Sequence, residues 1–135
     1  MIIAIDFDGT CVTHEYPKVG RGIGAELVLK ALTDNGHDLI LFTMRSAMRG
    51  ISPVTNKEED GGLSDAIKWF KDNDIPLWGI NHNPLQYKWT GSPKPYAQLY
   101  IDDAALGCPL IYGEHERPYV DWLKVEGMLV DMGLI

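Results

Sequence analysis

Four aspartates in two short motifs are the residues of this sequence best placed to do chemistry. Asp6 and Asp8 follow the apolar run 2–5, and Asp102 and Asp103 follow another apolar run. Residues two apart in an extended chain project from the same side, so Asp6 and Asp8 form a close pair. Neighbouring carboxylates repel each other, and a divalent metal ion between them relieves that repulsion. An Asx turn or a helix cap is the alternative for an isolated D-x-D-G sequence.

Two further polar side chains lie beside apolar runs and suit a bound phosphoryl group. Thr43 closes the run 38–42, where its hydroxyl can hydrogen-bond a phosphoryl oxygen. Lys94 shortly precedes the run 98–101, and its ammonium can offset the charge shared by a nucleophile and a phosphate. Lys88 is the competing lysine, and a solvated surface lysine is the alternative for either residue.

Taken together, these motifs resemble those of the haloacid dehalogenase (HAD) superfamily, most of whose members are Mg²⁺-dependent phosphatases. The segment D-F-D-G-T at 6–10 closely resembles the first motif, and Thr43 looks like the second. Lys94 looks like the third, in a K-P-x-A-x-x-Y-I-D-D pattern similar to that of several small members, and the pair at 102–103 resembles the fourth. The resemblance implies that Thr43 and Lys94 hold the phosphoryl oxygens as charge builds up in the transition state.

The same resemblance implies a role for each aspartate. Asp6 would attack phosphorus and form an aspartyl-phosphate. Asp8 would protonate the leaving oxygen and then activate the water that hydrolyses the intermediate. Mg²⁺ would be held by the carboxylates of Asp6 and Asp102 and by the backbone carbonyl of Asp8. Asp103 would orient a metal-bound water.

The elements that must position these residues alternate between short strands and longer helices. Apolar residues recur at helical spacing around 27–32 and 63–70, and Gly36 lies where the first helix would end. Such βαβ units predict an α/β fold, with a doubly wound, Rossmann-like parallel sheet and helices on both faces. At 135 residues the chain is expected to form a single domain, 1–135. The predicted strands are 2–5, 38–42, 77–80 and 98–101.

The spacing of the motifs leaves no room for a large cap domain. Only positions 9–42 separate Asp8 from Thr43, and only positions 44–93 separate Thr43 from Lys94, while helices and strands use much of both. The resemblance therefore implies a small, capless member, whose site stays open unless loops or a second subunit cover it.

Two long loops, 44–62 and 81–95, follow predicted strands and are expected to overhang the carboxyl edge of the sheet. Loops of this length are often functional. Arg45, His82 and Asn83 are the candidate contacts to the substrate, with Arg45 facing its anionic part. A solvated arginine and ordinary loop residues are the plainer alternatives.

The segment from Pro118 onward predicts a final helix with two apolar stripes. One stripe carries Val120, Leu123, Gly127 and Val130, and the other carries Trp122, Val125, Leu129 and Met132. Burial of both stripes within the monomer is favoured, and a homo-oligomer interface through this helix is the alternative.

Composition excludes several classes of protein. The net charge of −7, without a basic cluster, argues against a nucleic-acid groove. No apolar run approaches the roughly 20 residues needed to cross a bilayer, and the N-terminus lacks a secretory signal, so we expect a cytoplasmic protein that does not enter membranes. Cys11 and Cys108 are expected to be free thiols.

The resemblance thus implies a Mg²⁺-dependent phosphohydrolase that acts on a small phosphate ester or on a larger phosphorylated molecule. A Mg²⁺-dependent phosphoacceptor signalling domain is one alternative, but its phosphorylated aspartate would follow the third strand, where Asn81 and His82 stand. A catalytically silent binding protein on a HAD scaffold is another, and the intact set of polar motif residues argues against it. Sugar phosphates, nucleotides and larger phosphorylated molecules all remain open as substrates.

Overall fold

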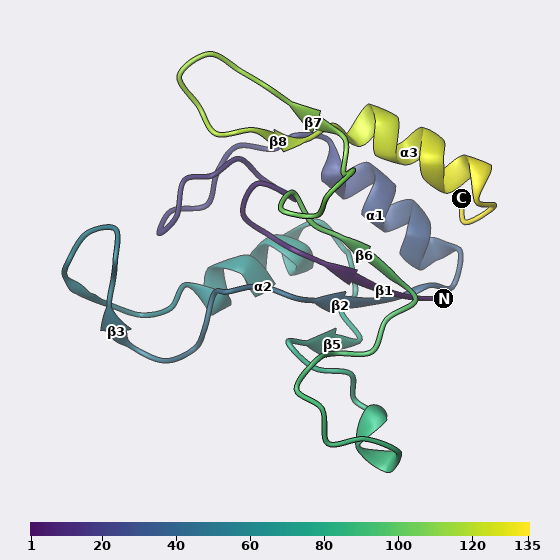
Figure 1. Cartoon of the computed structure of the whole chain (residues 1–135), viewed down its shortest axis with the longest axis horizontal. Coiled ribbons are helices and arrows are strands. Elements are labelled where there is room, and N and C mark those ends of the chain that lie inside the picture. Colours follow the sequence, from purple (N-terminus) through teal and green to yellow (C-terminus); the bar gives the residue numbers. More distant parts are fainter.

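A four-stranded parallel sheet with three α-helices forms the centre of the molecule (Figure 1). The computed structural model describes residues 1–135, except for the side chain of residue 59. The helices are α1 (Ala25–Asp34), α2 (Leu63–Asp72) and α3 (Trp122–Asp131), with a 3₁₀ turn η1 (Gln86–Lys88). The sheet strands are β1 (Ile2–Ile5), β2 (Asp38–Leu41), β5 (Gly79–Ile80) and β6 (Leu99–Ile101). Two hairpins add β3 (Gly50–Ile51) with β4 (Glu58–Glu59), and β7 (Leu110–Ile111) with β8 (Tyr119–Val120).

The strand order across the sheet is β5-β2-β1-β6, and every neighbouring pair is parallel. This confirms the predicted parallel α/β sheet. Ile5, the last residue of β1, lies opposite Leu41 of β2 and Ile101 of β6. Because the strands end in register, the residues that follow β1, β2 and β6 emerge together at one edge of the sheet.

All three α-helices pack on one face of the sheet, which corrects the predicted helices on both faces. Ile3 and Ile5 of β1 belong to one buried cluster with Leu29 of α1, Phe70 of α2 and Leu129 of α3. The chain moves from β1 to β2 to β5 in one direction across the sheet, and right-handed crossovers then place α1 and α2 on the same face. None of the helices in the described residues is long and apolar enough to cross a membrane.

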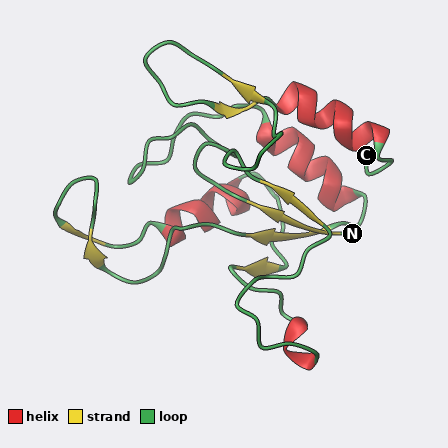
Figure 2. Ribbon diagram, viewed as in Figure 1, coloured by secondary structure: helices red, strands yellow, loops and turns green.

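The segment 81–97 covers the other face in place of a helix. Ile40 of β2 is buried on that face, and both Ile40 and Pro84 lie against the backbone of Gly79. The segment carries the chain from the carboxyl end of β5 back to the start of β6, and it contains only the short turn η1 (Figure 2). Prolines at 84, 93 and 95 and a glycine at 91 explain why no α-helix forms there.

Of the two loops predicted to overhang the carboxyl edge, only one does so. The segment 44–62 contains the β3–β4 hairpin and projects beyond the carboxyl ends of the strands (Figure 1). The segment 81–95 instead runs back along the sheet, because the next strand is parallel and must start at the opposite edge.

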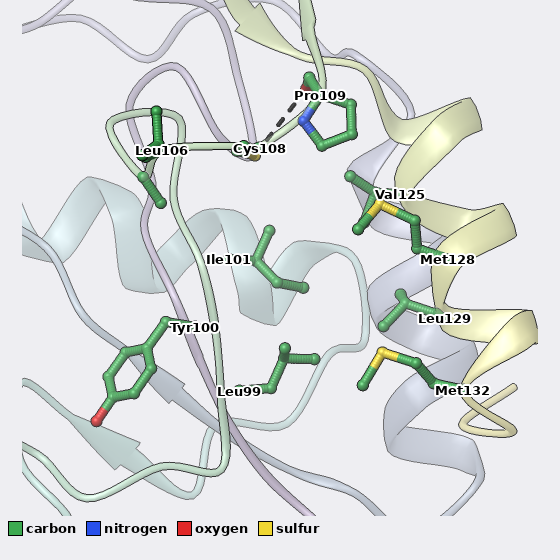
Figure 3. Close-up of a pocket in the computed structure, with 12 residues that line it drawn as sticks. Leu99, Tyr100, Ile101, Leu106, Cys108, Pro109, Val125, Met128, Leu129 and Met132 are labelled. Carbon is green, nitrogen blue, oxygen red and sulfur yellow. Dashed lines mark hydrogen bonds between the residues drawn. The ribbon is translucent and has the colours of Figure 1, made fainter.

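The C-terminal helix buries most of one predicted apolar stripe: Trp122, Val125 and Leu129 are buried, and Met132 is 51% exposed. Leu99 and Ile101 of β6 point toward Val125 and Leu129 of α3, while Tyr100 points away (Figure 3). An apolar cavity of about 230 Å³ lies between α3, β6 and the segment 105–109.

The stripe with Leu123 and Val130 was also expected to be buried within the monomer, and for these two residues this expectation is wrong. Leu123 is 82% exposed and Val130 is 53% exposed, whereas Val120 is buried as predicted but belongs to β8 and not to the helix. The helix has only one neighbouring layer, α1 and the sheet, so its outer face stays in solvent.

Candidate functional site

Three carboxylates gather where β1 and β6 end. Asp6 follows β1, and Asp102 and Asp103 follow β6, its neighbour in the sheet. One carboxylate oxygen from each of the three lies within 4.8 Å of the other two. The backbone N–H of Asp6 donates to the carbonyl of Ile101 at 3.0 Å, so the pairing of the two strands continues into the site.

Thr10 links these carboxylates through its hydroxyl. Thr10 Oγ1 lies 2.7 Å from Asp6 Oδ2 and 3.2 Å from Asp103 Oδ1, and it accepts a bond of 3.0 Å from the backbone N–H of Asp103. The indole N–H of Trp122 donates to the Thr10 carbonyl at 2.6 Å, which anchors the loop from the helix side. Gly9, at φ 81°, allows the sharp turn that brings Thr10 back to the strand end.

The carboxylate of Asp6 carries charge that no described cation offsets. Burial raises the pKa of Asp6 from 3.8 to about 7; the hydrogen bond from Thr10 opposes this rise and the charge of Asp102 adds to it. Among the described residues, no lysine or arginine forms an ion pair with Asp6 or Asp102. Three hard oxygen donors with excess negative charge form a donor set that fits a hard divalent cation.

Asp8 lies outside this group of three carboxylates and is held by Arg45. Both carboxylate oxygens of Asp8 accept from the guanidinium, Oδ2 from Nε at 2.8 Å and Oδ1 from Nη2 at 2.7 Å. The Arg45 side chain is only 1% exposed, and that of Asp8 is 18% exposed. Such a two-pronged pair fixes the direction of the carboxylate as well as its position.

The remaining donors of Arg45 are satisfied by the chain itself, which corrects its predicted role as a substrate contact. Nη1 donates to the carbonyls of Pro17 and Gly62, and Nη2 donates to that of Lys18. The guanidinium lies 5.1 Å from the ring centre of Phe7 and 5.1 Å from that of Tyr16. Arg45 therefore joins the loop after β1 to the start of α2.

Thr43 stands at the carboxyl edge of the sheet, as its place in the sequence predicts. The residue is buried, and its backbone N–H donates to Asn81 Oδ1 at 2.8 Å. Its hydroxyl oxygen accepts from the backbone N–H of Arg45 at 3.1 Å. In the part of the chain that the structure describes, that hydroxyl donates to no group, so its hydrogen is available to a ligand.

The two candidate lysines both lie on the segment 81–97, outside the carboxylate cluster. The ammonium of Lys94 lies 5.4 Å from the ring centre of Tyr100, and the side chain is exposed. Among the described residues it forms no ion pair with a carboxylate. Lys88 is exposed at the end of η1.

His82 and Asn83 are neighbours in the sequence, but the first is exposed and the second is buried. His82 is exposed, with Nδ1 2.8 Å from the carbonyl of Ile80. Asn83 is only 3% exposed, which corrects its predicted role as a substrate contact. Its amide donates to the Tyr96 carbonyl and accepts from the N–H of Leu85, so it stabilises the fold of the segment.

His14 is a site residue that the sequence did not point to. Its Nε2 lies 2.8 Å from Asp103 Oδ2, and both side chains are largely buried. Thr10 had a signal, since it completes the D-F-D-G-T segment, but a lone histidine in a loop gave none. Both cysteines are free, as expected.

Comparison with known proteins adds a structural relative. No protein-family model matches the chain, and no curated protein matches it. The structure of a conserved protein from Bacteroides thetaiotaomicron is similar, with a TM-score of 0.71 and 31% sequence identity. The match covers 98% of this chain and 91% of that one. The chain therefore belongs to the same family as this conserved protein of Bacteroides thetaiotaomicron.

Proposed function

We propose that the chain is a Mg²⁺-dependent phosphohydrolase of HAD type, with Asp6 as its nucleophile. The main observation behind this proposal is the group of three carboxylates Asp6, Asp102 and Asp103. It brings the first and fourth sequence motifs together at one edge of a parallel sheet. The HAD-like interpretation of the fold and the absence of a cap are parts of the same proposal. Thr43 supports it, since it ends the strand next to β1 with a hydroxyl hydrogen to donate.

The reaction runs in two displacements. A carboxylate oxygen of Asp6 attacks phosphorus, the bond to the leaving oxygen breaks, and an aspartyl-phosphate forms. Water then attacks that phosphorus, and inorganic phosphate leaves with the Asp6 carboxylate restored. Asp8 moves the protons, first to the leaving oxygen and then from the attacking water.

The carboxylates of Asp6 and Asp102 and the backbone carbonyl of Asp8 would hold Mg²⁺, with Asp103 orienting a bound water. When bound, the ion supplies positive charge that offsets the carboxylates and the phosphoryl oxygens. Thr10 keeps Asp6 and Asp103 together through its hydroxyl.

Two side chains would bind the phosphoryl oxygens. Thr43 donates its hydroxyl hydrogen from the end of β2. Lys94 leaves the ring of Tyr100 to reach the phosphate, because an exposed cation–π contact is worth only about 0.5–1 kcal/mol. A phosphate group offers the ammonium a stronger, charge-assisted hydrogen bond.

The test measures turnover of a panel of phosphate esters by the purified 135-residue chain. Each ester is assayed with Mg²⁺, then with a chelator, and then after Mg²⁺ is restored. Turnover should disappear with the chelator and return with the metal. Asp6→Asn should abolish turnover and leave the circular dichroism spectrum unchanged. Turnover without metal, or near-normal activity of Asp6→Asn with deamidation excluded by mass spectrometry, would refute the proposal.

A phosphoacceptor domain that holds its phosphoryl group for longer is the second candidate. The observation that favours it is the Arg45 clamp, which engages both oxygens of the residue assigned to proton transfer. Mixing the protein with acetyl phosphate and following protein-bound phosphate separates the two. A hydrolase shows continued phosphate release, whereas a phosphoacceptor shows one equivalent and then a slow decay.

A further inference from the structure

We propose that His14 is a positioning residue that holds Asp103 in the carboxylate cluster, and that residue 9 must be glycine to admit the imidazole. The role rests on the proposed metal site, because Asp103 belongs to it. His14 lies in the loop after β1 and Asp103 in the loop after β6, so the contact ties the two loops together. The two side chains are 12% and 15% exposed, which keeps competing water away from the bond.

Asp103 needs this donor because Thr10 cannot serve two carboxylates at once. A hydroxyl carries one hydrogen. Thr10 Oγ1 lies 2.7 Å from Asp6 Oδ2 but 3.2 Å from Asp103 Oδ1, so the hydrogen goes to Asp6. His14 Nε2, at 2.8 Å from Oδ2, is then the side-chain donor to Asp103. With Oδ2 held by His14, Oδ1 lies 3.2 Å from Thr10 Oγ1, the hydroxyl that also binds Asp6.

Gly9 makes the contact possible because the imidazole occupies the space that a side chain at position 9 would need. A Cβ at position 9 would lie 1.9 Å from His14 Nε2 and within 2.6 Å of two ring carbons. No rotation of a methyl group relieves such an overlap, so the ring would have to leave Asp103. Gly9 also has φ 81°, a conformation that L side chains rarely adopt.

The role requires a hydrogen-bond donor at the position of Nε2, and a matched pair of amide variants tests this. The amide nitrogen of glutamine is as many bonds from Cβ as Nε2 is, whereas that of asparagine corresponds to Nδ1. His14→Gln should therefore keep the Mg²⁺ dissociation constant within about 3-fold of the wild type. His14→Asn should weaken it by about 10-fold or more, the usual loss when the outer hydrogen bonds around a metal are disturbed, because Asp103 would no longer be held where it orients the metal-bound water. His115→Asn, at an exposed loop histidine, is the control and should change nothing.

Calorimetric titration of the full-length protein with Mg²⁺ measures the binding, without any turnover. A second measurement uses the metal-free protein: the amide NMR signals of Thr10 and Asp103 should shift in His14→Asn and stay near wild type in His14→Gln. Wild-type affinity in His14→Asn, equal weakening in both amide variants, or unshifted signals in His14→Asn would overturn the role. Failure of the wild type to bind Mg²⁺ would count against the proposed function, and the NMR comparison would still decide the role of His14.

Gly9→Ala, made in the wild type and in His14→Asn, tests the second half of the proposal. In the wild type it should weaken Mg²⁺ binding by about 10-fold or more, since it displaces the ring. In His14→Asn the added loss should be below about 3-fold, because only the backbone strain remains and variants in contact are not additive. Equal losses in both backgrounds would show that backbone strain, and not the imidazole, requires glycine at this position.

Discussion

Asp6 is the residue at which burial and charge conflict most strongly. Its pKa is raised from 3.8 to about 7, first by burial and then by the charge of Asp102, while Thr10 opposes the rise. The folded metal-free protein therefore holds this proton more tightly than the unfolded chain between about pH 4 and pH 7. The cost of ionising Asp6 is absent below that range and fully present above it. The metal-free protein is thus expected to lose stability as the pH rises through this range.

Urea unfolding of the wild type and Asp6→Asn in the presence of a chelator checks this pH dependence. At about pH 8 Asp6→Asn should be more stable than the wild type, by on the order of 2–4 kcal/mol, since each pKa unit corresponds to about 1.4 kcal/mol and Asp6 keeps some solvent. At about pH 4 the two proteins should unfold at the same urea concentration. An advantage of equal size at both pH values would mean that ionisation of Asp6 is not its source.

A second prediction at the residue scale concerns the contribution of Arg45 to stability. Arg45→Gln leaves the largely buried carboxylate of Asp8 without its partner and three backbone carbonyls without a donor. We expect a loss of about 3–5 kcal/mol in unfolding free energy, the usual cost of removing one member of a buried pair.

Arg21→Gln is the matched control for Arg45. Arg21 also donates through two nitrogens to a carboxylate, that of Glu116, but its side chain is 56% exposed. Its loss should hardly change the thermal unfolding midpoint, because solvent-exposed ion pairs contribute little. Equal shifts in the two variants would contradict the structural role of Arg45.

At the scale of elements, α3 carries apolar residues on two faces, and we expect only those on the buried face to stabilise the fold. Leu129 is 2% exposed and packs in the core, whereas Leu123, on the same helix, is 82% exposed. Leu129→Ala should cost about 2–5 kcal/mol, as is usual for a buried leucine, and Leu123→Ala less than about 0.5 kcal/mol. Chemical unfolding of both variants measures the difference. A comparable loss from Leu123→Ala would show that its face of the helix is covered in solution.

Helices and strands could be predicted from repeated patterns of apolar residues in the sequence. Which face of an element is buried could not, because that depends on its neighbours in the fold. Helical spacing located α1 and α2, and apolar runs ending in polar residues located β1, β2 and β6. Two apolar stripes on one helix look alike in the sequence, but α3 has only one neighbouring layer. The sequence predicts the segment 81–95 as a loop, and the prolines at 84, 93 and 95 explain why no α-helix forms before β6.

Likewise, part of the candidate site could be predicted from the sequence and part could not. Parallel strands bring their carboxyl ends together, so the meeting of Asp6 with Asp102 and Asp103 follows from the order of the strands. The direction of Arg45 does not, because it depends on carbonyls supplied by two other segments. His14 likewise reaches its partner across 89 positions of sequence, and only the folded loops show that contact.

At the scale of the whole molecule, the helices cover one face of the sheet and the segment 81–97 covers the other. This segment carries two exposed lysines, Lys88 and Lys94. Lys94 lies over Tyr100, two positions before Asp102, whereas Lys88 ends η1. If the phosphohydrolase proposal holds, Lys94 is the lysine that reaches the phosphoryl group.

Lys94→Ala should lower kcat/KM on a small generic ester, p-nitrophenyl phosphate, by about 100-fold or more, because charge stabilisation of the transition state is a large term. Lys88→Ala removes the same side chain from the same segment and should stay within about 2-fold of the wild type. Steady-state kinetics with saturating Mg²⁺ compares them, and unchanged thermal midpoints show that both variants fold. The reverse ranking would assign the phosphate contact to Lys88. Small losses in both would place the balancing charge outside this segment, where Thr43 and the bound metal would have to supply the whole stabilisation.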